Sequence, residues 1–342
     1  MKFLSFITRR TVHSVFVLFG LSIVIFIIGR VMPGDPARVA VGARAPDWVV
    51  DNLRQQMHLD ESLPVQYFYW LRDALQGNFG ISLVTRRAVA QDITEFFPAS
   101  LELALFALLI TAVLGIGLGT LSARHKDKLI DNVVRIISYM GVVTPSFVFA
   151  IVFLLIFGYV LDWFPTIGRL SDSVPRPPRV TGFMTVDALL AGNFAAFIDA
   201  VHHLVLPALA VAMGAMAQEA RITRASMSEN LSKDYIAAGR ALGLPERLVM
   251  GRFLLKPSLI PTISIMGLDF AASLSNAFLV ELIFVWPGLS RYGMNAILRK
   301  DLNAISAVIL VLGVVFIIVN ILVDLIVARL DPRIGLRAAR SD

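Results

Sequence analysis

The sequence predicts an all-α integral membrane protein with six transmembrane helices. Of the 342 residues, 57% are apolar and only 16% are Asp, Glu, Lys or Arg, whereas a soluble domain has roughly 25% charged residues. A helix that crosses a bilayer needs about 20 mainly apolar residues, and six stretches of that kind occur. Basic residues are concentrated in alternate segments between these stretches, as expected of a multi-pass protein.

Five of the six stretches contain no Asp, Glu, Lys or Arg, namely residues 11–29, 103–123, 136–161, 200–218 and 302–323. The sixth, 257–280, contains a single charged residue, Asp269, and is followed by Glu281. The run 188–198 is only 11 residues long, so we expect it to be interfacial or re-entrant. The first stretch has a basic flank like that of a secretory signal, but it is long and lacks a small-residue cleavage site. We therefore expect a retained first helix.

The distribution of Lys and Arg predicts the orientation. Segments 1–10, 124–135, 219–256 and 328–342 together hold 18 basic residues, and the alternate segments 30–102, 162–199 and 281–301 hold 13 over a greater length. By the positive-inside rule, both termini and the 124–135 and 219–256 loops are cytoplasmic. The four Trp residues all fall in the opposite segments, where their rings suit the headgroup layer.

Several classes of protein are excluded by composition. The chain has no Cys and five His without a metal-ligand spacing, which argues against disulfides, thiolate sites and a metalloenzyme. It has no phosphate-binding loop of the G-x-x-x-x-G-K-[ST] type, so any ATP must be bound by a partner. The net charge is +6, and the basic residues that give it lie between apolar runs rather than on a polar domain. This distribution favours anionic lipid over nucleic acid as a neighbour. His202-His203 is interpreted as an interfacial or helix-end pair rather than a metal site, and we assign it no role.

Two features inside the apolar stretches bear on helix packing. Gly115 and Gly119 are four residues apart, a spacing that allows a neighbouring helix to approach closely. Pro145 and Pro207 each interrupt a predicted span, and a proline at that depth frees a backbone carbonyl that neighbouring helices or a wet cavity must satisfy. The Pro145 kink either serves packing or shapes a translocation path.

Polar residues in and beside the fifth predicted span are candidates for that path. Asp269, Asn276 and Glu281 follow one another at intervals of seven and five residues. An ionisable group at membrane depth must be compensated by water or by a partner. Asp269 either lines a cavity or belongs to a buried pair. The candidate path residues are thus Pro145, Asp269, Asn276 and Glu281.

The segment 230–247 predicts a short helix in a cytoplasmic turn. Ser232 is suited to the N-cap and Gly243 to the left-handed position that ends a helix, while Pro245 can begin the next one. The surface of this helix of about ten residues is mostly Ala and Gly. Such a helix is either pressed against another protein or an amphipathic connector on the inner leaflet. Its candidate contact residues are Asp234, Tyr235, Ile236, Ala237, Ala238, Gly239, Ala241, Gly243 and Leu244.

This segment resembles the EAA loop of ABC-importer permeases. Ala237-Ala238-Gly239 and Gly243 match in spacing, and Phe253 and Leu255 follow, although Ala237 replaces the Glu and Pro257 falls one place late. Eight further collinear pieces are similar to the dipeptide/oligopeptide/nickel branch: Pro33-Gly34-Asp35-Pro36, Leu63-Pro64-Val65-Gln66-Tyr67, Gly77-Asn78-Phe79-Gly80-Ile81-Ser82, Thr144-Pro145-Ser146-Phe147, Asp234-Tyr235-Ile236, the stretch from Glu281 through Trp286-Pro287-Gly288-Leu289, Asn320 to Leu325, and Asp331-Pro332-Arg333.

The resemblance implies a type I ABC importer transmembrane domain in a bacterial inner membrane. It implies residues 1–97 as a first helix plus an external segment, 98–330 as the permease core with a coupling helix at about 232–245, and 331–342 as a cytoplasmic tail. The partners would be a second homologous permease forming a heterodimer, two cytoplasmic ATPases that hold ATP and Mg, an external solute-binding protein and the bilayer, with no nucleic acid.

The implied function is peptide import by alternating access, driven through the coupling helix by the ATPases. The chain itself would bind no cofactor and make or break no bond. Nickel chelates or another small solute are alternative cargoes of this branch. The rival class, a secondary transporter or channel, would call for an inverted repeat and several intramembrane carboxylates, and the sequence offers no such repeat and only Asp269 near mid-membrane. An intramembrane hydrolase would need a paired nucleophile and base, which is not found.

Overall fold

The computed structural model describes residues 2–31, 36–42 and 44–330. Within them, all regular structure is helical except for an isolated bridge between Ile81 and Ala88. Five helices or helix runs are long and apolar enough to cross a membrane, and a sixth is obtained if one bent pair counts as a span. The five are Val12–Arg30, Val89–Arg124, Phe194–Leu231, Glu246–Asn276 and Leu302–Leu330. The predicted all-α membrane class is confirmed.

The described chain divides into two compact units. The first comprises residues 2–11, 97–291 and 315–330, and the second comprises 12–96 and 292–314. The first three residues of the Pro33-Gly34-Asp35-Pro36 motif and the whole Asp331-Pro332-Arg333 motif lie outside the described residues. The helices, in chain order, are α1 (Lys2–Val31), α2 (Pro36–Val41), α3 (Asp47–Gln56), α4 (Leu63–Leu75), α5 (Val89–Ile110), η1 (Thr111–Gly115), α6 (Ile116–Arg124), α7 (Leu129–Val143), α8 (Ser146–Phe153), η2 (Leu154–Val160), α9 (Met184–Leu190), α10 (Phe194–Leu231), α11 (Asp234–Ala241), α12 (Glu246–Leu248), η3 (Val249–Leu255), α13 (Lys256–Asn276), α14 (Phe278–Ile283), α15 (Leu289–Leu298) and α16 (Leu302–Leu330).

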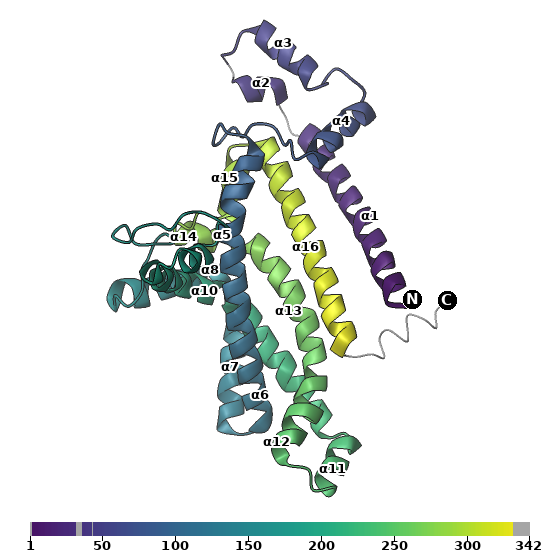
Figure 1. The fold of residues 1–342 in the computed structure, drawn as a ribbon, viewed down its shortest axis with the longest axis vertical. Helices are drawn as coiled ribbons and strands as arrows, with labels where there is room; N and C mark the ends of the chain where they lie inside the picture. The colour runs from purple at the N-terminus through teal and green to yellow at the C-terminus, as the bar shows by residue number, and fades with distance from the viewer. Residues whose placement is uncertain (1, 32–35, 43, 331–342) are drawn as a thin grey trace. The chain divides into compact units, whose positions relative to one another are not determined.

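Helix α10 is the central element of the first unit (Figure 1), and α6, α7, α8, α9 and α13 all pack against it. Small residues make the close contacts possible. A Cβ on Gly119 would lie 2.6 Å from the backbone oxygen of Ala220, and one on Gly141 would lie 3.2 Å from that of Met213. Without a hydrophobic driving force between helices in lipid, such close packing is what holds them together. The predicted packing role of Gly115 and Gly119 is confirmed, since Gly115 also faces the backbone of α10, at Met216.

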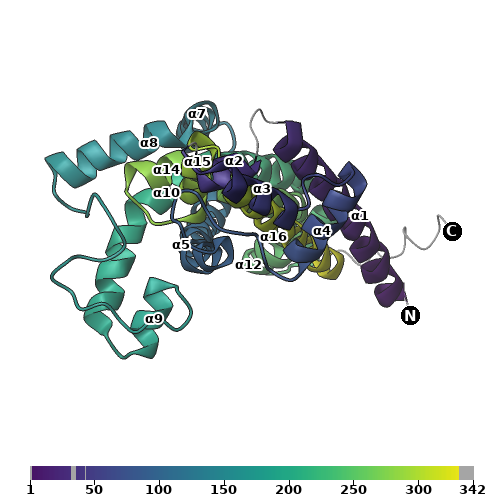
Figure 2. The same cartoon turned by 90° about the horizontal axis from the view of Figure 1, so that it is seen from above.

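The predicted span 136–161 is not one continuous helix, which corrects the sequence prediction. The chain breaks at Thr144-Pro145, and the axes of Leu129–Val143 and Ser146–Val160 differ by 108°. Figure 2 shows α8 turning away from α7 at this point. Pro145 cannot donate a backbone hydrogen bond and pushes Thr144 out of the helical region, and Thr144 is accordingly extended, with ψ 124°.

Two other helices differ in length from the apolar runs that predicted them. Helix α10 has 38 residues and continues well beyond residue 218, where Ala220, Thr223 and Met227 are buried against the rest of the protein. Helix α13 ends at Asn276 instead of continuing to 280, and α14 begins at Phe278. The run 188–198 is divided between α9 and the start of α10.

The second unit is held together by buried polar anchors. The hydroxyls of Ser22 on α1 and Tyr67 on α4 lie 2.7 Å apart, and the Phe26 ring packs edge-on against Tyr67. Asp301, fully buried, accepts hydrogen bonds from the Ser82 hydroxyl at 2.6 Å and the Leu83 amide at 2.6 Å. Motif residues in this part of the chain therefore have structural tasks.

The glycine contact of α6 with α10 makes a prediction about stability. Gly119→Ala places a Cβ against backbone that cannot give way, so we expect a loss of about 1–3 kcal/mol in the free energy of unfolding. Gly117→Ala is the matched control on the same helix, because its Cβ would meet nothing within 4 Å. Thermal unfolding of both variants in detergent measures the difference, and equal midpoints would contradict this packing.

Candidate functional site

The predicted short helix in the loop after α10 is α11, with eight residues. Its end has the expected glycine geometry. Gly243 has φ +71°, the amide of Leu244 donates to the Gly239 carbonyl at 3.2 Å, and the amide of Gly243 donates to that of Arg240 at 2.9 Å, the pattern of a Schellman motif. Its start differs from the prediction. Lys233 is the N-cap, whereas the Ser232 hydroxyl donates to Glu229 O at 2.8 Å and ends α10.

One face of α11 is anchored in the protein and the other is exposed. Ile236 is 1% exposed and belongs to a cluster with Ala123, Met227, Val249 and Leu254, which ties α11 to the ends of α6, α10 and η3. Gly239 is also buried and Leu244 is half-buried. The remaining candidate contact residues, Asp234, Tyr235, Ala237, Ala238, Ala241 and Gly243, are exposed. The neighbouring Leu242 is 80% exposed, an apolar side chain without cover at a helix end.

Polar contacts fix the angle of α11 on its supports. The Tyr235 hydroxyl donates to Asn230 Oδ1 at 3.1 Å, and Asn230 Nδ2 donates to Ser258 Oγ at 2.9 Å. Arg240 pairs with Glu246 at 2.8 Å, and this hydrogen bond raises the pKa of the Arg240 guanidinium. Helix α11 is therefore held in a fixed orientation, and its outer face exposes mainly small side chains.

Asp269, the predicted intramembrane acid, lines a small pocket between α5, α10 and α13. The pocket wall includes Ala104, Thr111, Ala212 and Ser273. Gln218 Nε2 donates to Asp269 Oδ2 at 3.3 Å. Asp269 is only partly buried, and no basic group among the described residues forms an ion pair with it. It thus has the surroundings of a cavity-lining group rather than of an ion pair.

Glu219 on α10 is a second buried acid of the first unit, and the sequence patterns described above do not single it out. Its side chain is fully buried, and neither carboxyl oxygen has a hydrogen-bond partner among the described residues. The carboxyl groups of Glu219 and Asp269 are close enough to interact electrostatically. An unpaired buried carboxylate is costly, so Glu219 is the least compensated polar group of this region. It directly follows the charge-free run 200–218, and a search for acids at the ends of such runs would have found it.

The other predicted path residues lie elsewhere. Pro145 forms the sharp break between α7 and α8, and Asn276 is exposed at the end of α13. Glu281 is fully buried; it accepts hydrogen bonds from the Ser100 hydroxyl and, at 2.7 Å, from the Arg291 amide. Ser100 in turn accepts from the Leu289 amide at 2.7 Å. Within the first unit, Glu281 therefore joins α5 to the chain after α14, and it is not brought together with Asp269.

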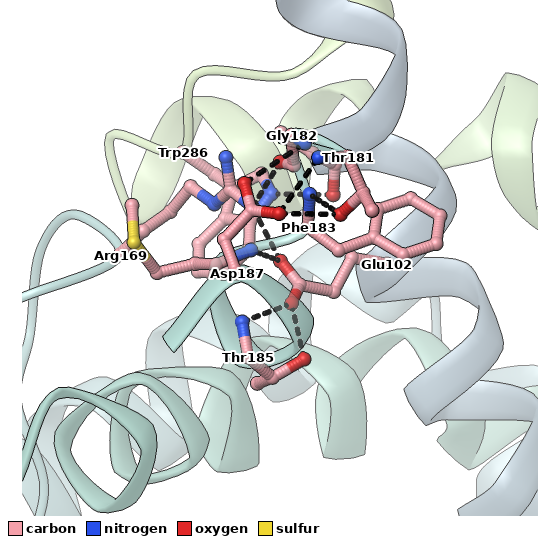
Figure 3. Close-up of polar contacts among 10 residues, drawn as sticks. Glu102, Arg169, Thr181, Gly182, Phe183, Thr185, Asp187 and Trp286 are labelled. Atoms are coloured by element: carbon pink, nitrogen blue, oxygen red, sulfur yellow. Dashed lines mark hydrogen bonds and ion pairs between the residues drawn. The ribbon is translucent and has the colours of Figure 1, made fainter. Parts of the chain in front are cut away.

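A polar cluster centred on Glu102 organises the segment between η2 and α10 (Figure 3). Glu102 of α5 pairs with Arg169 and accepts hydrogen bonds from the amide and the hydroxyl of Thr185, at 2.8 and 2.6 Å. The Arg169 guanidinium lies over the Trp286 ring, 5.5 Å from the ring centroid. Glu102 is only 5% exposed, and no sequence motif had pointed to it.

Two more carboxylates hold the same segment. Asp187 accepts hydrogen bonds from the amide and hydroxyl of Thr181, both at 2.7 Å, and from the Gly182 amide at 2.9 Å. Burial opposes its ionisation, but these hydrogen bonds prevail and hold the pKa of Asp187 below its usual value. Asp199 accepts from the amide and the hydroxyl of Ser171 at 2.7 and 2.8 Å.

The histidine pair has structural contacts. His203 is buried and its Nδ1 lies 2.8 Å from the Asp199 carbonyl oxygen, while the His202 ring packs against Phe164 at 4.8 Å. Among the described residues, no group of three or more His, Cys, Asp or Glu could hold a metal ion.

Comparisons with known proteins agree on one family. Residues 115–336 match the family described as "Binding-protein-dependent transport system inner membrane component", and residues 3–104 match its N-terminal membrane component. The chain is 40% identical over 335 residues to a probable D,D-dipeptide transport system permease protein of Escherichia coli K12, covering 98% of each chain.

Two other relatives span nearly the full length as well. A di/tripeptide transport system permease protein of Pseudomonas aeruginosa is 36% identical over 339 residues, covering 97% of this chain and 98% of the relative. A glutathione transport system permease protein of E. coli K12 is 30% identical over 331 residues, covering 97% and 99%.

The Glu102 cluster predicts a local loss of structure in one variant. Glu102→Gln breaks a buried ion pair and turns a donor toward amide groups that need an acceptor, so we expect the 162–193 segment to be destabilised by about 3–5 kcal/mol. Hydrogen exchange of that segment measures the effect. Glu95→Gln on the same helix is the matched control, because its pair with Arg87 at 2.8 Å is 43% and 38% exposed and contributes at most about 1 kcal/mol. Equal exchange in both variants would contradict the role of the cluster.

Proposed function

We propose that this chain, which belongs to the binding-protein-dependent transport system inner membrane components, carries short peptides across the membrane. It would do so as one of two permeases of an ABC importer. As a member of this family it is a multi-pass, non-catalytic inner-membrane permease without a bound cofactor. Its substrates are peptide-like, as the names of its relatives indicate.

Dipeptides are favoured over other substrates because the relatives named for them have the higher sequence identities to this chain. The relatives named for D,D-dipeptides and for di/tripeptides are 40% and 36% identical, whereas the one named for glutathione is 30% identical. Glutathione is itself a modified tripeptide, so all three substrates share free carboxylates and an ammonium group. Nickel chelates remain the alternative that the sequence motifs allow.

The orientation and partners follow from charge and from α11. Eighteen of the 31 Lys and Arg residues lie in the segments that include the chain ends and the α11 loop, so we propose that both termini and α11 are cytoplasmic. ATPase and binding-protein partners are implied by the family. We propose a second, homologous permease as the third kind of partner, which would give a heterodimer.

The observation that carries the mechanism is the construction of α11. Its buried residues, Ile236 and Gly239, connect it to α6, α10 and η3, and its outer face presents small side chains beside the exposed Leu242. Such a face fits into a groove of a partner with little steric hindrance. Movement of an ATPase pressed against it would pass directly to three membrane helices, and the spans would then alternate between outward and inward access.

The coupling prediction uses two variants of α11. Gly243→Val places a β-branched residue at φ +71°, which costs about 1–2 kcal/mol and turns the end of the helix. Ala238→Trp keeps the exposed face away from a groove. We expect both to retain insertion and permease pairing but to lose the stimulation of ATP hydrolysis by loaded binding protein, measured with uptake in reconstituted vesicles.

Matched controls separate coupling from misfolding. Gly243→Asn tolerates the left-handed conformation, and Ala195→Trp enlarges an exposed alanine at the far end of α10; both should keep stimulation. Full stimulation in both Gly243→Val and Ala238→Trp would reject α11 as the coupling element.

The orientation has a test of its own. In the naturally Cys-free chain, Ser232→Cys should react with an impermeant maleimide from the ATPase side alone.

We further propose that Asp269 and Glu219 belong to the translocation path. Asp269 lines the pocket between α5, α10 and α13. Glu219, whose carboxyl oxygens have no hydrogen-bond partner among the described residues, directly follows Gln218, the residue that donates to Asp269. Without such a partner, the buried carboxyl group of Glu219 does not stabilise the fold. It is therefore available for a cationic group that passes by.

Buried acids that form no ion pair should respond to neutralisation differently from one that does. Glu219→Gln and Asp269→Asn should not lower the stability of the complex, because no ion pair is broken, yet they should change peptide uptake several-fold. Asp131→Asn is the contrasting control: Asp131 is fully buried and pairs with Arg224 at 2.5 Å, so its loss should cost about 3–5 kcal/mol. Normal uptake in both path variants would remove these two residues from the path.

A further inference from the structure

A basic pocket lies between α6, α7 and α10, apart from α11 and from the intramembrane acids. It is lined by Arg135, Arg221 and Arg224 together with the hydroxyl-bearing side chains of Ser122, Ser138 and Tyr139. It adjoins the turn between α6 and α7, toward the end of the first unit that carries α11 (Figure 1). None of the residues that line it is acidic.

One arginine of the pocket is structural. The Arg224 guanidinium donates from Nε and an Nη to the two oxygens of Asp131, at 2.5 and 2.6 Å. Asp131 also accepts from the Ser122 hydroxyl at 2.5 Å and from the Asp127 amide at 2.9 Å. This buried network fixes the floor of the pocket and balances the charge of Arg224.

The other two arginines are not balanced. Arg135 and Arg221 are exposed, and within the described residues neither forms a hydrogen bond or an ion pair that would use its guanidinium. The carboxylate of Asp131 is already engaged by Arg224, by the Ser122 hydroxyl and by the Asp127 amide. The pocket therefore has an excess of positive charge and several free donors, which is the chemistry that binds a phosphate group.

The surroundings indicate which phosphate. The side of α7 next to Arg135 exposes Leu129 (77%), Val133 (45%), Ile136 (59%) and Tyr139 (55%). A free phosphate ion would gain nothing from these apolar side chains, whereas the acyl chains of a lipid would cover them. Basic pockets between transmembrane helices on the cytoplasmic side are suited to anionic headgroups.

We propose that this pocket binds the phosphate headgroup of an anionic phospholipid, with Arg135 and Arg221 contacting the phosphate and the hydroxyls of Ser138 and Tyr139 completing the site. The lipid would brace α6 and α7 against α10 beside the α6–α7 turn. Neither arginine belongs to the coupling helix or to the proposed path.

The test is lipid retention by the assembled complex. The parent complex and an Arg135→Gln/Arg221→Gln variant are reconstituted in vesicles of phosphatidylcholine with and without phosphatidylglycerol, extracted, and examined by native mass spectrometry. We expect the parent to retain phosphatidylglycerol and the variant to lose it, with a weakening of about fivefold for each arginine removed. Thermal unfolding should show stabilisation by phosphatidylglycerol in the parent only.

The control is Arg176→Gln/Arg299→Gln, which removes two exposed arginines outside the pocket and should retain the lipid like the parent. Arg224 is left intact, so the buried network survives and the variant should fold. A titration with inorganic phosphate separates the two sources of the ligand: stabilisation of the parent by phosphate alone, equal to that by the lipid, would reject the lipid. Unchanged phosphatidylglycerol retention in the Arg135/Arg221 variant would reject the site itself.

Discussion

The first unit depends on the close approach of other helices to α10. In hydrocarbon the hydrophobic effect does not drive helices together, so their association depends on close van der Waals packing and on hydrogen bonds between helices. At Gly119 and Gly141 the absence of a side chain lets α6 and α7 reach the backbone of α10, and on another side a hydroxyl pair, Thr223 and Thr262 at 3.0 Å, joins α13 to it. Both elements with proposed tasks lie against this helix: α10 contributes Met227 to the cluster that holds α11 and Ala212 to the pocket around Asp269.

Much of this architecture could be read from the sequence because apolar length is a strong signal in membranes. The positions of the straight spans, the glycine packing and the glycine end of α11 all follow from local rules. The 108° break at Pro145 did not follow, because a proline in a span is compatible with a gentle kink when neighbouring helices satisfy the freed carbonyl. Whether it becomes a break is decided by tertiary packing.

The carboxylates show a more specific limit. A search for charge-free stretches ends each span at its first acid, so it assigns Glu219 and Glu102 to the loops, although both lie inside long helices and are buried. Asp269 was noticed because apolar residues surround it on both sides. The resemblance singles out Glu281 and Ser82, but their structural tasks depend on contacts with distant residues, with Ser100 for Glu281 and with Asp301 for Ser82.

The contact between Glu281 and Gly288 has a consequence for how such chains can diverge. A Cβ on residue 288 would fall on the carboxylate of Glu281, so the glycine provides the room that the acid occupies. Substitutions at the two positions therefore depend on each other. A residue larger than glycine fits at position 288 only if the side chain at position 281 is shorter than Glu. Shortening Glu281 first, however, leaves the Ser100 hydroxyl and the Arg291 amide without their acceptor. Each single step is unfavourable, and drift at this corner of the protein requires paired substitutions.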